Sequence, residues 1–539
     1  MAASKEDMLK VSGAVGYEIP DEHLEDYTTL LGRMKGVLET LSAMDGKCSS
    51  NPVRTMTPLL ILSPDYTPSP DLTSTPRKNV HFPQKSDNPL NAWAWRCDCT
   101  HTSPSSELLK GKTVCLKDNI ALAHVPCLLG TESFTDWTPV VDATVATRIL
   151  EAGGTIAGKA VCENLSRGAV SVSAATGPVH NPYAHGYSAG GSSSGTAALV
   201  ASGAADMGLG CDQGGSIRIP AAMCGLWGMK ATLGLVPYTG IASNDASVDF
   251  VGPMTRTGLD CATLLQAIAG VDGFDDRQIA GCPFPEQVPK YADELRQSGK
   301  DGARGLRIGI LKEALSSPVL EEELKDKFLA AAKQFENLGA TVEEVSVPLH
   351  ESARTIYSVM SKMGNHMGML GRATGRRQLM MTDLFEKKNF PYTQDALSKM
   401  SVFSKEGLFS GELGWTSFPY AYSKAVNLSR KLKDDYDAAL KDFDILVMPT
   451  TLRPSFPIPA VDASPVEHID ANKGMTENTA AFNASGHPAL AMPIGFIPSK
   501  ADPSIKVPAS MQIVGRFWEE GTILKAAYAW EQTTDWNSF

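Results

Sequence analysis

The chain has 539 residues, of which 43% are hydrophobic and 20% charged, ordinary values for a globular protein with a large core. A net charge of −11 disfavours proteins that bind nucleic acid through its phosphates or that adhere to anionic membranes. No apolar run reaches the roughly 18–20 residues that cross a bilayer. The polar start, MAASKEDMLK, lacks a secretory signal core, so we expect a cytoplasmic location.

The ten cysteines all lie within the first 282 residues. Spread so widely in a chain of this kind, they are typical of reduced, buried thiols rather than of disulfides. Cys97, Cys99 and His101 form the one cluster with some character of a metal site. Their spacing fits no usual zinc pattern, so we expect no metal there.

The N-terminal part predicts a helix followed by a linker. Residues 21–44 carry apolar side chains at helical spacing, with Asp21 expected as the N-cap. Residues 52–83 contain seven prolines and predict an extended connector. We therefore expect residues 1–85 to be a helical extension and linker, and residues 86–539 to form the main domain.

Alternating strand and helix patterns follow, and they predict an α/β fold with a mixed, twisted β-sheet covered by helices. Each strand is a short apolar run, and each helix is an amphipathic segment beside one. The segments that carry this expectation are residues 112–122, 142–160, 305–311, 320–338, 340–347 and 442–450.

Residues 186–240 contain 13 of the 47 glycines. Because the same stretch carries apolar residues such as Trp227, we expect close packing of backbones rather than a flexible linker. Two familiar patterns occur here and both are disfavoured. Gly186–Gly190 has the form G-x-S-x-G around Ser188, but it follows a proline-bearing loop. GGSSSGT, residues 190–196, lacks the lysine of a phosphate-binding loop.

A third interpretation joins Lys117, Ser192 and Ser216. A serine hydroxyl becomes a good nucleophile only when a base removes its proton. Lysine can act as that base when burial keeps it neutral. Lys117 follows the apolar run Val114-Cys115-Leu116, which favours burial, although a surface lysine at a strand end is the alternative.

The loop before Ser216 has the composition of an oxyanion hole. Glycines allow successive backbone amides to turn toward one point, where they stabilise the negative charge that develops on an attacked carbonyl. We therefore expect Gln213, Gly214, Gly215 and Ser216 to form an oxyanion loop.

The stretch GGSSSGTAALVASGAADMGLGCDQGGSIRIPAAMCG closely resembles the signature of the amidase signature family, and FNASGHPALAMPIGF, residues 482–496, extends the likeness. The resemblance runs from about residue 88 to the end of the chain. It implies the amidase signature fold, a catalytic domain at residues 86–539 and a Ser–Ser–Lys triad. In that triad Ser216 attacks the amide carbonyl, Ser192, beside a cis peptide bond, relays the proton, and neutral Lys117 is the base.

The same resemblance implies no metal or cofactor and gives Ser166 a pocket-lining role that brings it to the substrate. Asp212 and Arg218 are expected, from their spacing, to form a buried structural pair. The chain departs from the usual pattern at Cys211, where many members have threonine, and at Ser194, where the motif has glycine. These departures leave the triad intact but bear on the geometry of the loop.

Within the family, the chain resembles bacterial amidases of nitrile metabolism, which are commonly dimers, and fungal members that cleave carbamates such as urethane. We therefore expect a homodimer acting on small amides or carbamates. The alternatives are a glutaminase subunit of a tRNA-dependent amidotransferase and a non-catalytic binding protein of the same fold. An insertion at residues 350–430 is expected to form a pocket. Its Met-rich part, 357–381, is interpreted either as pocket wall or as ordinary core.

Overall fold

The computed structural model describes residues 3–42, 61–62, 68–372, 374–388, 391–460 and 462–539. The chain divides into two compact units, Met1–Asp71 and Leu72–Phe539. Within the described residues no helix is both long enough and apolar enough to cross a membrane. The nine cysteines of those residues are free thiols, and Cys48 lies outside them.

The first unit contains helices α1 (Lys5–Val15) and α2 (Asp21–Ser42) and a short ladder of β1 (Ile61–Leu62) with β2 (Pro68–Ser69). Asp21 is the first residue of α2 rather than its N-cap, because the carbonyl of Pro20 already accepts a hydrogen bond from the N–H of His23. The predicted end of this helix, residues 43–44, lies outside the described residues, as does much of the predicted connector.

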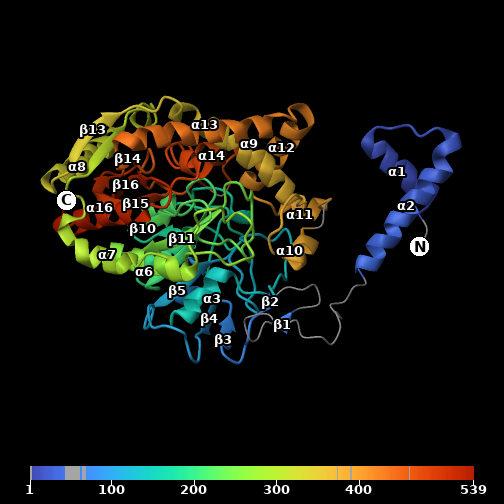
Figure 1. The fold of residues 1–539 in the computed structure, drawn as a ribbon, viewed down its shortest axis with the longest axis horizontal. Coiled ribbons are helices and arrows are strands. Elements are labelled where there is room, and N and C mark those ends of the chain that lie inside the picture. Colours follow the sequence, from blue (N-terminus) through green and yellow to red (C-terminus); the bar gives the residue numbers. More distant parts are fainter. Residues whose placement is uncertain (1–2, 43–60, 63–67, 373, 389–390, 461) are drawn as a thin grey trace. The chain divides into compact units, whose positions relative to one another are not determined.

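The second unit is built on one mixed sheet, within which twelve of the described strands lie in the order β13-β12-β14-β16-β15-β10-β11-β9-β5-β6-β4-β3 (Figure 1). The pairs β5–β6, β5–β9, β12–β13 and β12–β14 are parallel, and the other neighbours are antiparallel. The strands are β3 (Arg77–His81), β4 (Trp93–Cys99), β5 (Thr113–Lys117), β6 (Thr155–Ala160), β9 (Met207–Asp212), β10 (Trp227–Lys230), β11 (Phe250–Thr255), β12 (Arg307–Leu311), β13 (Thr341–Val345), β14 (Ile445–Pro449), β15 (Ala489–Pro498) and β16 (Lys506–Gly515). A separate ladder joins β7 (His180–Asn181) to β8 (Ala184–Ser188).

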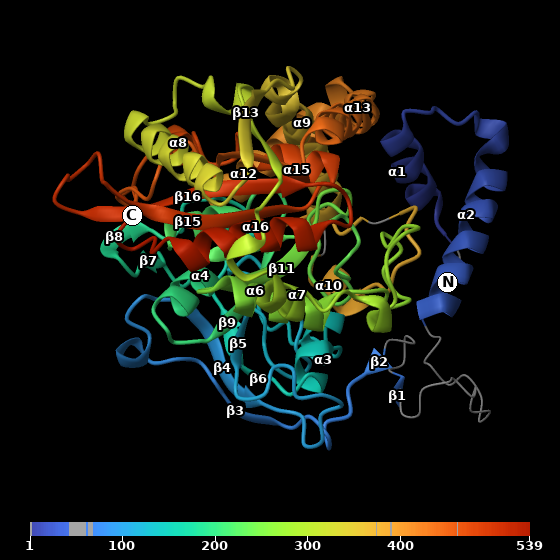
Figure 2. The same ribbon diagram turned by 60° about the vertical axis from the view of Figure 1, so that its left-hand side comes forward.

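Helices cover both faces of this sheet (Figure 2). One face is packed by α3 (Thr144–Glu151), α6 (Gly258–Ile268), α8 (Glu322–Asn337) and α16 (Glu520–Thr533). The strands also pack against α4 (Ser194–Ala201) and α5 (Arg218–Met223). The remaining helices are α7 (Tyr291–Ser298), α9 (His350–Met369), α10 (Thr382–Lys387), α11 (Gln394–Ser398), α12 (Val402–Ser417), α13 (Ala421–Asp442), α14 (Pro465–Asp470) and α15 (Ala480–Ser485).

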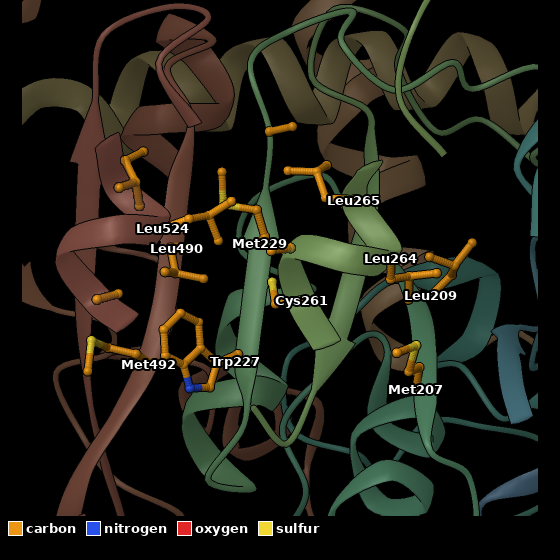
Figure 3. Close-up of a cluster of buried hydrophobic side chains, with 14 of the residues drawn as sticks. Met207, Leu209, Trp227, Met229, Cys261, Leu264, Leu265, Leu490, Met492 and Leu524 are labelled. Atoms are coloured by element: carbon orange, nitrogen blue, oxygen red, sulfur yellow. The ribbon is translucent and has the colours of Figure 1, made fainter. Parts of the chain in front are cut away.

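Successive residues of a strand point to opposite faces of the sheet, and the core follows this rule. Val114 and Leu116 of β5 join the large cluster beneath α3, α6, α8 and α16, whereas Cys115 joins the cluster that includes α4 and α5. Figure 3 shows part of the large cluster, with β9, β10 and β15 facing α6 and α16 through the side chains of Met207, Leu209, Trp227, Met229, Cys261, Leu264, Leu490, Met492 and Leu524. Lys117, two residues after Cys115, therefore belongs to the α4/α5 face.

The predicted α/β class and the strand and helix segments of the second unit are confirmed. The predicted connector is wrong at its end, because residues 77–81 form β3 and pair with β4. The division between the units accordingly falls at residue 71, earlier than the boundary near residue 85 that the prolines indicated.

Candidate active site

The candidate site lies where two parallel strands end side by side. β5 ends at Lys117 and its parallel neighbour β9 ends at Asp212, so both carboxyl ends meet at one edge of the sheet. Glycines on β9 allow α4 to approach closely. A Cβ at Gly208 would lie 2.4 Å from Cγ2 of Thr196, and one at Gly210 would lie 2.9 Å from Oγ of Ser193. The start of α4 is thereby held against these strand ends.

The amine of Lys117 is fully buried and contacts two oxygen atoms. Nζ donates to Oγ of Ser192 at 2.8 Å and to the carbonyl of Cys211 at 3.3 Å. Burial lowers the pKa of Lys117, because a charged ammonium loses its water there, while the more distant negative charges of Asp212 and Asp249 oppose this shift. Throughout the described part of the chain no carboxylate lies within ion-pairing distance of this amine, so its neutral form is favoured.

Ser192 is also fully buried, on the loop that precedes α4. The Gly191–Ser192 peptide bond is cis, in agreement with the expectation, and the carbonyl of Ser192 accepts a hydrogen bond from the N–H of Glu163 at 3.1 Å. The loop is packed against the helix that follows Ser216, since a Cβ at Gly190 would lie 2.7 Å from Cα of Pro220.

Asp212 and Arg218 form the buried pair that their spacing predicted. Two hydrogen bonds of 3.0 Å join the guanidinium to the carboxylate, and both side chains are fully buried. Burial by itself would raise the pKa of Asp212, but the charge and hydrogen bonds of Arg218 outweigh it and lower that pKa to about 2. The ionised carboxylate also accepts the N–H groups of Gly215 at 2.6 Å and Ile217 at 3.1 Å. It therefore fixes the turn that contains Ser216.

Ser216 is only partly buried, unlike Lys117 and Ser192. No hydrogen bond of its hydroxyl, to Ser192 or to another group, is found in the described residues. The backbone N–H groups of Gln213, Gly214 and Ser216 likewise have no acceptor among the residues that the structure describes. The N–H of Gly215 does, since it donates to Asp212. The amide of Gly215 is thus engaged by Asp212, and glycine allows the chain to turn at φ +133°, while the oxyanion role of the loop stays a prediction.

Ser166 is buried, has a φ of +59° and lines a cavity. The lining of this cavity includes Leu129, Phe134, Ser243, Met369, Lys388 and Tyr392. Met369 belongs to the Met-rich segment, so that segment contributes one wall. Met360 and Met381 are buried in clusters of apolar side chains, Met363 is buried against Gly414, and all three fit the alternative interpretation as ordinary core.

The other candidate groups have structural surroundings. Ser188 ends β8 in the small separate ladder, and its Oγ accepts the N–H of Gly190 at 3.0 Å. Cys97 and Cys99 are buried on β4, and burial raises the pKa of Cys97 to about 12. Among the residues described, no group of three or more potential ligands could hold a metal ion.

The sequence of residues 87–524 matches the family described as Amidase. The chain belongs to the amidase family. It is 35% identical to an enantioselective amidase of Rhodococcus rhodochrous over 463 residues, which covers 84% of this chain and 85% of that relative. It is 32% identical to a glutamyl-tRNA(Gln) amidotransferase subunit of Halothermothrix orenii, with 79% of this chain and 85% of that relative covered.

Solved structures of other hydrolases have the same architecture. The native peptide amidase of Stenotrophomonas maltophilia superimposes with a TM-score of 0.64 at 29% identity, over 79% of this chain and 83% of that one. A 6-aminohexanoate cyclic dimer hydrolase superimposes with a TM-score of 0.67 at 22% identity and supports the fold alone. The chain is therefore an amidase-family hydrolase of carbon–nitrogen bonds in amides.

Several residues that shape this amidase site carry no signal in the local sequence. Asn483 and Thr479, from the segment before β15, reach Asp212 and the carbonyl of Gly214 at 2.8 Å and 2.7 Å. Tyr357 on α9 covers Gly214, where a Cβ would lie 2.2 Å from the tyrosine hydroxyl. Each is distant in sequence from Ser192 and Ser216, and although Asn483 lies in the stretch 482–496 that extends the family likeness, no local pattern indicated its contact with Asp212. Arg167 could have been found from the sequence, because it directly follows Ser166, which the resemblance singled out.

Gly215→Ala tests how tightly this loop is held. The new Cβ would lie 2.4 Å from Oγ1 of Thr479, and the φ of +133° is itself unfavourable for alanine. We expect backbone strain and overpacking to lower the free energy of unfolding by about 2–4 kcal/mol. The control is Gly203→Ala, at φ +77° with no atom within 4 Å, which should cost only about 1–2 kcal/mol. Equal falls in the thermal unfolding midpoints of the two variants would contradict the close packing of the loop.

Proposed function

We propose that the chain hydrolyses small carboxamides through an acyl-enzyme on Ser216, with Ser192 as proton relay and Lys117 as base. The observation that carries the proposal is the 2.8 Å hydrogen bond between the buried amine of Lys117 and Oγ of Ser192. A lysine held neutral can take a proton, and among the described residues the one side chain that it contacts by a hydrogen bond is a serine.

In the first half-reaction Oγ of Ser216 attacks the amide carbon while its proton passes to Ser192, and the proton of Ser192 passes to Nζ of Lys117. The N–H groups of Gln213, Gly214 and Ser216 stabilise the oxyanion. Return of a proton from Lys117 through Ser192 releases the leaving amine as the carbon–nitrogen bond breaks. Water then attacks the ester by the same proton route and frees the acid and the serine.

Small carboxamides are the proposed substrates, and carbamates such as urethane would react through the same tetrahedral chemistry. The names of two relatives, an enantioselective amidase and a peptide amidase, support the proposal for amides. The similarity to a component of a glutamyl-tRNA(Gln) amidotransferase makes a glutaminase role within such a complex the second candidate. Release of ammonia from simple amides by the purified chain alone would favour the first, and activity confined to glutamine in the presence of partner proteins would favour the second.

Homodimer formation and a cytoplasmic location stay predictions. The same holds for the absence of a cofactor and for direct contact between Ser166 and the substrate. The third candidate, a binding protein without catalysis, predicts no covalent product at Ser216 with any amide.

Covalent trapping tests the proposed nucleophile. After the wild-type protein is mixed with an aryl carboxamide and quenched in acid, peptide mass spectrometry should find the acyl group on Ser216, and Ser216→Ala should show neither adduct nor hydrolysis. Ser188→Ala is the matched control, since it removes a serine that also has a nucleophile-like sequence context. An adduct that persists in Ser216→Ala, or that disappears in Ser188→Ala while the protein stays folded, would refute the assignment.

The pH dependence of kcat tests the proposed base. Only the neutral amine of Lys117 accepts a proton, so kcat should rise with pH through the lowered pKa of Lys117 and then level off. Lys117→Met should lower kcat by about 10²–10⁴-fold and remove this dependence. Glu163 is a second group that could titrate in this range, because burial raises its pKa to about 7. Glu163→Gln removes that titration and leaves the one of Lys117. Loss of the rising limb in Glu163→Gln would assign that limb to Glu163 and contradict the role of Lys117.

A further inference from the structure

Arg167 is a partly buried arginine whose guanidinium has two buried nitrogens without partners. Its Nε and Nη2 atoms are buried without a hydrogen bond. Across the described residues no carboxylate lies within the 4.0 Å that defines an ion pair with its guanidinium. Unpaired buried guanidinium nitrogens are costly, and a protein that retains them normally offers them to a ligand.

Helix α12 has a glycine where it packs against this side chain. A Cβ at Gly407 of α12 would lie 2.0 Å from Nη1 of Arg167, so the guanidinium occupies the space that a larger residue there would fill. The carboxylate that interacts electrostatically with the guanidinium is that of Glu406. Its Oε1 already accepts hydrogen bonds from Lys362 and, at 2.7 Å, from Ser410. Burial lowers the pKa of Arg167 to about 10, which still leaves it charged at neutral pH.

A second cation lies in the same region. Lys388 lines the cavity that contains Ser166, and its amine makes one long hydrogen bond, 3.5 Å, to the carbonyl of Gly368. Burial first, and then repulsion from Arg167, lowers the pKa of Lys388 to about 8, while Asp249 opposes the shift. Arg167 and Lys388 therefore sense each other's charge.

Two tyrosines relate Arg167 to the cavity and to the loop before Ser216. Arg167 directly follows the cavity-lining Ser166 and interacts electrostatically with Tyr357 and Tyr392. Tyr392 lines the cavity, and Tyr357 covers Gly214 in the loop that leads to Ser216. A substrate bound at Ser216 with its acyl chain in this cavity would thus extend toward the two cations.

We propose that Arg167 and Lys388 form a carboxylate-binding subsite, so that the preferred substrates are amides whose acyl chain ends in a carboxylate. This inference rests on the proposed function, since it names the substrate class of that same site. The planar fork of a guanidinium matches the two oxygens of a carboxylate. Leu129, Phe134 and Met369 line the cavity with apolar surface suited to the methylene groups between the amide and the carboxylate.

The test compares pairs of substrates in which one member ends in a carboxylate and the other in a methyl group. Succinamate, glutaramate and adipamate are assayed against butanamide, pentanamide and hexanamide. For the wild-type protein we expect kcat/KM to be higher for the charged member of at least one pair. In Arg167→Met the ratio of charged to uncharged kcat/KM for that pair should fall about 10- to 100-fold, as expected for the loss of a charge-assisted hydrogen bond. Lys388→Met should lower the same ratio, and Arg167→Lys should restore part of it.

The control is Arg304→Met, which removes an exposed arginine that pairs with Asp301 and changes the net charge equally. This variant should keep the wild-type ratio. Thermal unfolding of every variant checks the fold, and calorimetry of glutaramate binding to Ser216→Ala, with and without Arg167→Met, gives the affinity without turnover. An unchanged ratio in both Arg167→Met and Lys388→Met, or equal glutaramate binding with and without Arg167, would overturn the subsite. Absence of hydrolysis for every amide would instead refute the proposed function.

Discussion

The removal of one lysine amine from water is the constraint on which the site depends. Strand alternation sends Lys117 to the α4/α5 face, where its nearest partners are a serine hydroxyl and a backbone carbonyl. Neither partner carries a charge that would hold the amine in its protonated form. In an aqueous setting an amine of this kind is an ammonium and cannot accept a proton. Burial therefore shifts the pKa of Lys117 toward the neutral amine, against the opposing effect of nearby acidic groups.

Arg218 is also fully buried, but unlike Lys117 it has charged and polar partners that stabilise its positive charge. Arg218 pairs with Asp212 and also donates to Gln512 and to the carbonyl of Thr479, at 2.7 Å and 2.9 Å. These contacts tie the turn before α5 to β16 and to the segment before β15, nearly 300 residues further along the chain. The turn that carries Ser216 is thus held by the centre of the sheet. Arg167 differs from Arg218 in this respect, because two buried nitrogens of its guanidinium have no hydrogen-bond partner among the described residues.

Much of this site follows from local sequence, and the remainder does not. The apolar run before Lys117, the glycines around Ser192 and Ser216, and the spacing of Asp212 and Arg218 each reflect local geometry that the sequence states directly. The engagement of the Gly215 amide by Asp212 was not foreseen, because composition indicates that a loop can turn but not which amides remain free. Residues 77–81 were assigned to a linker because their neighbouring prolines dominate the local pattern, whereas pairing with β4 decides their structure.

The partners supplied by α9, α12 and the segment before β15 lie far from the signature and depend on tertiary packing. Tyr357 and Gly407 have meaning only once α9 and α12 are placed beside Gly214 and Arg167. Neutron diffraction from deuterated crystals, at a pH where kcat has reached its plateau, would test the central claim most directly, because it counts the deuterons on Nζ of Lys117. The account predicts two deuterons and a hydrogen bond between that nitrogen and Ser192. Three deuterons on Nζ would show an ammonium and would contradict it.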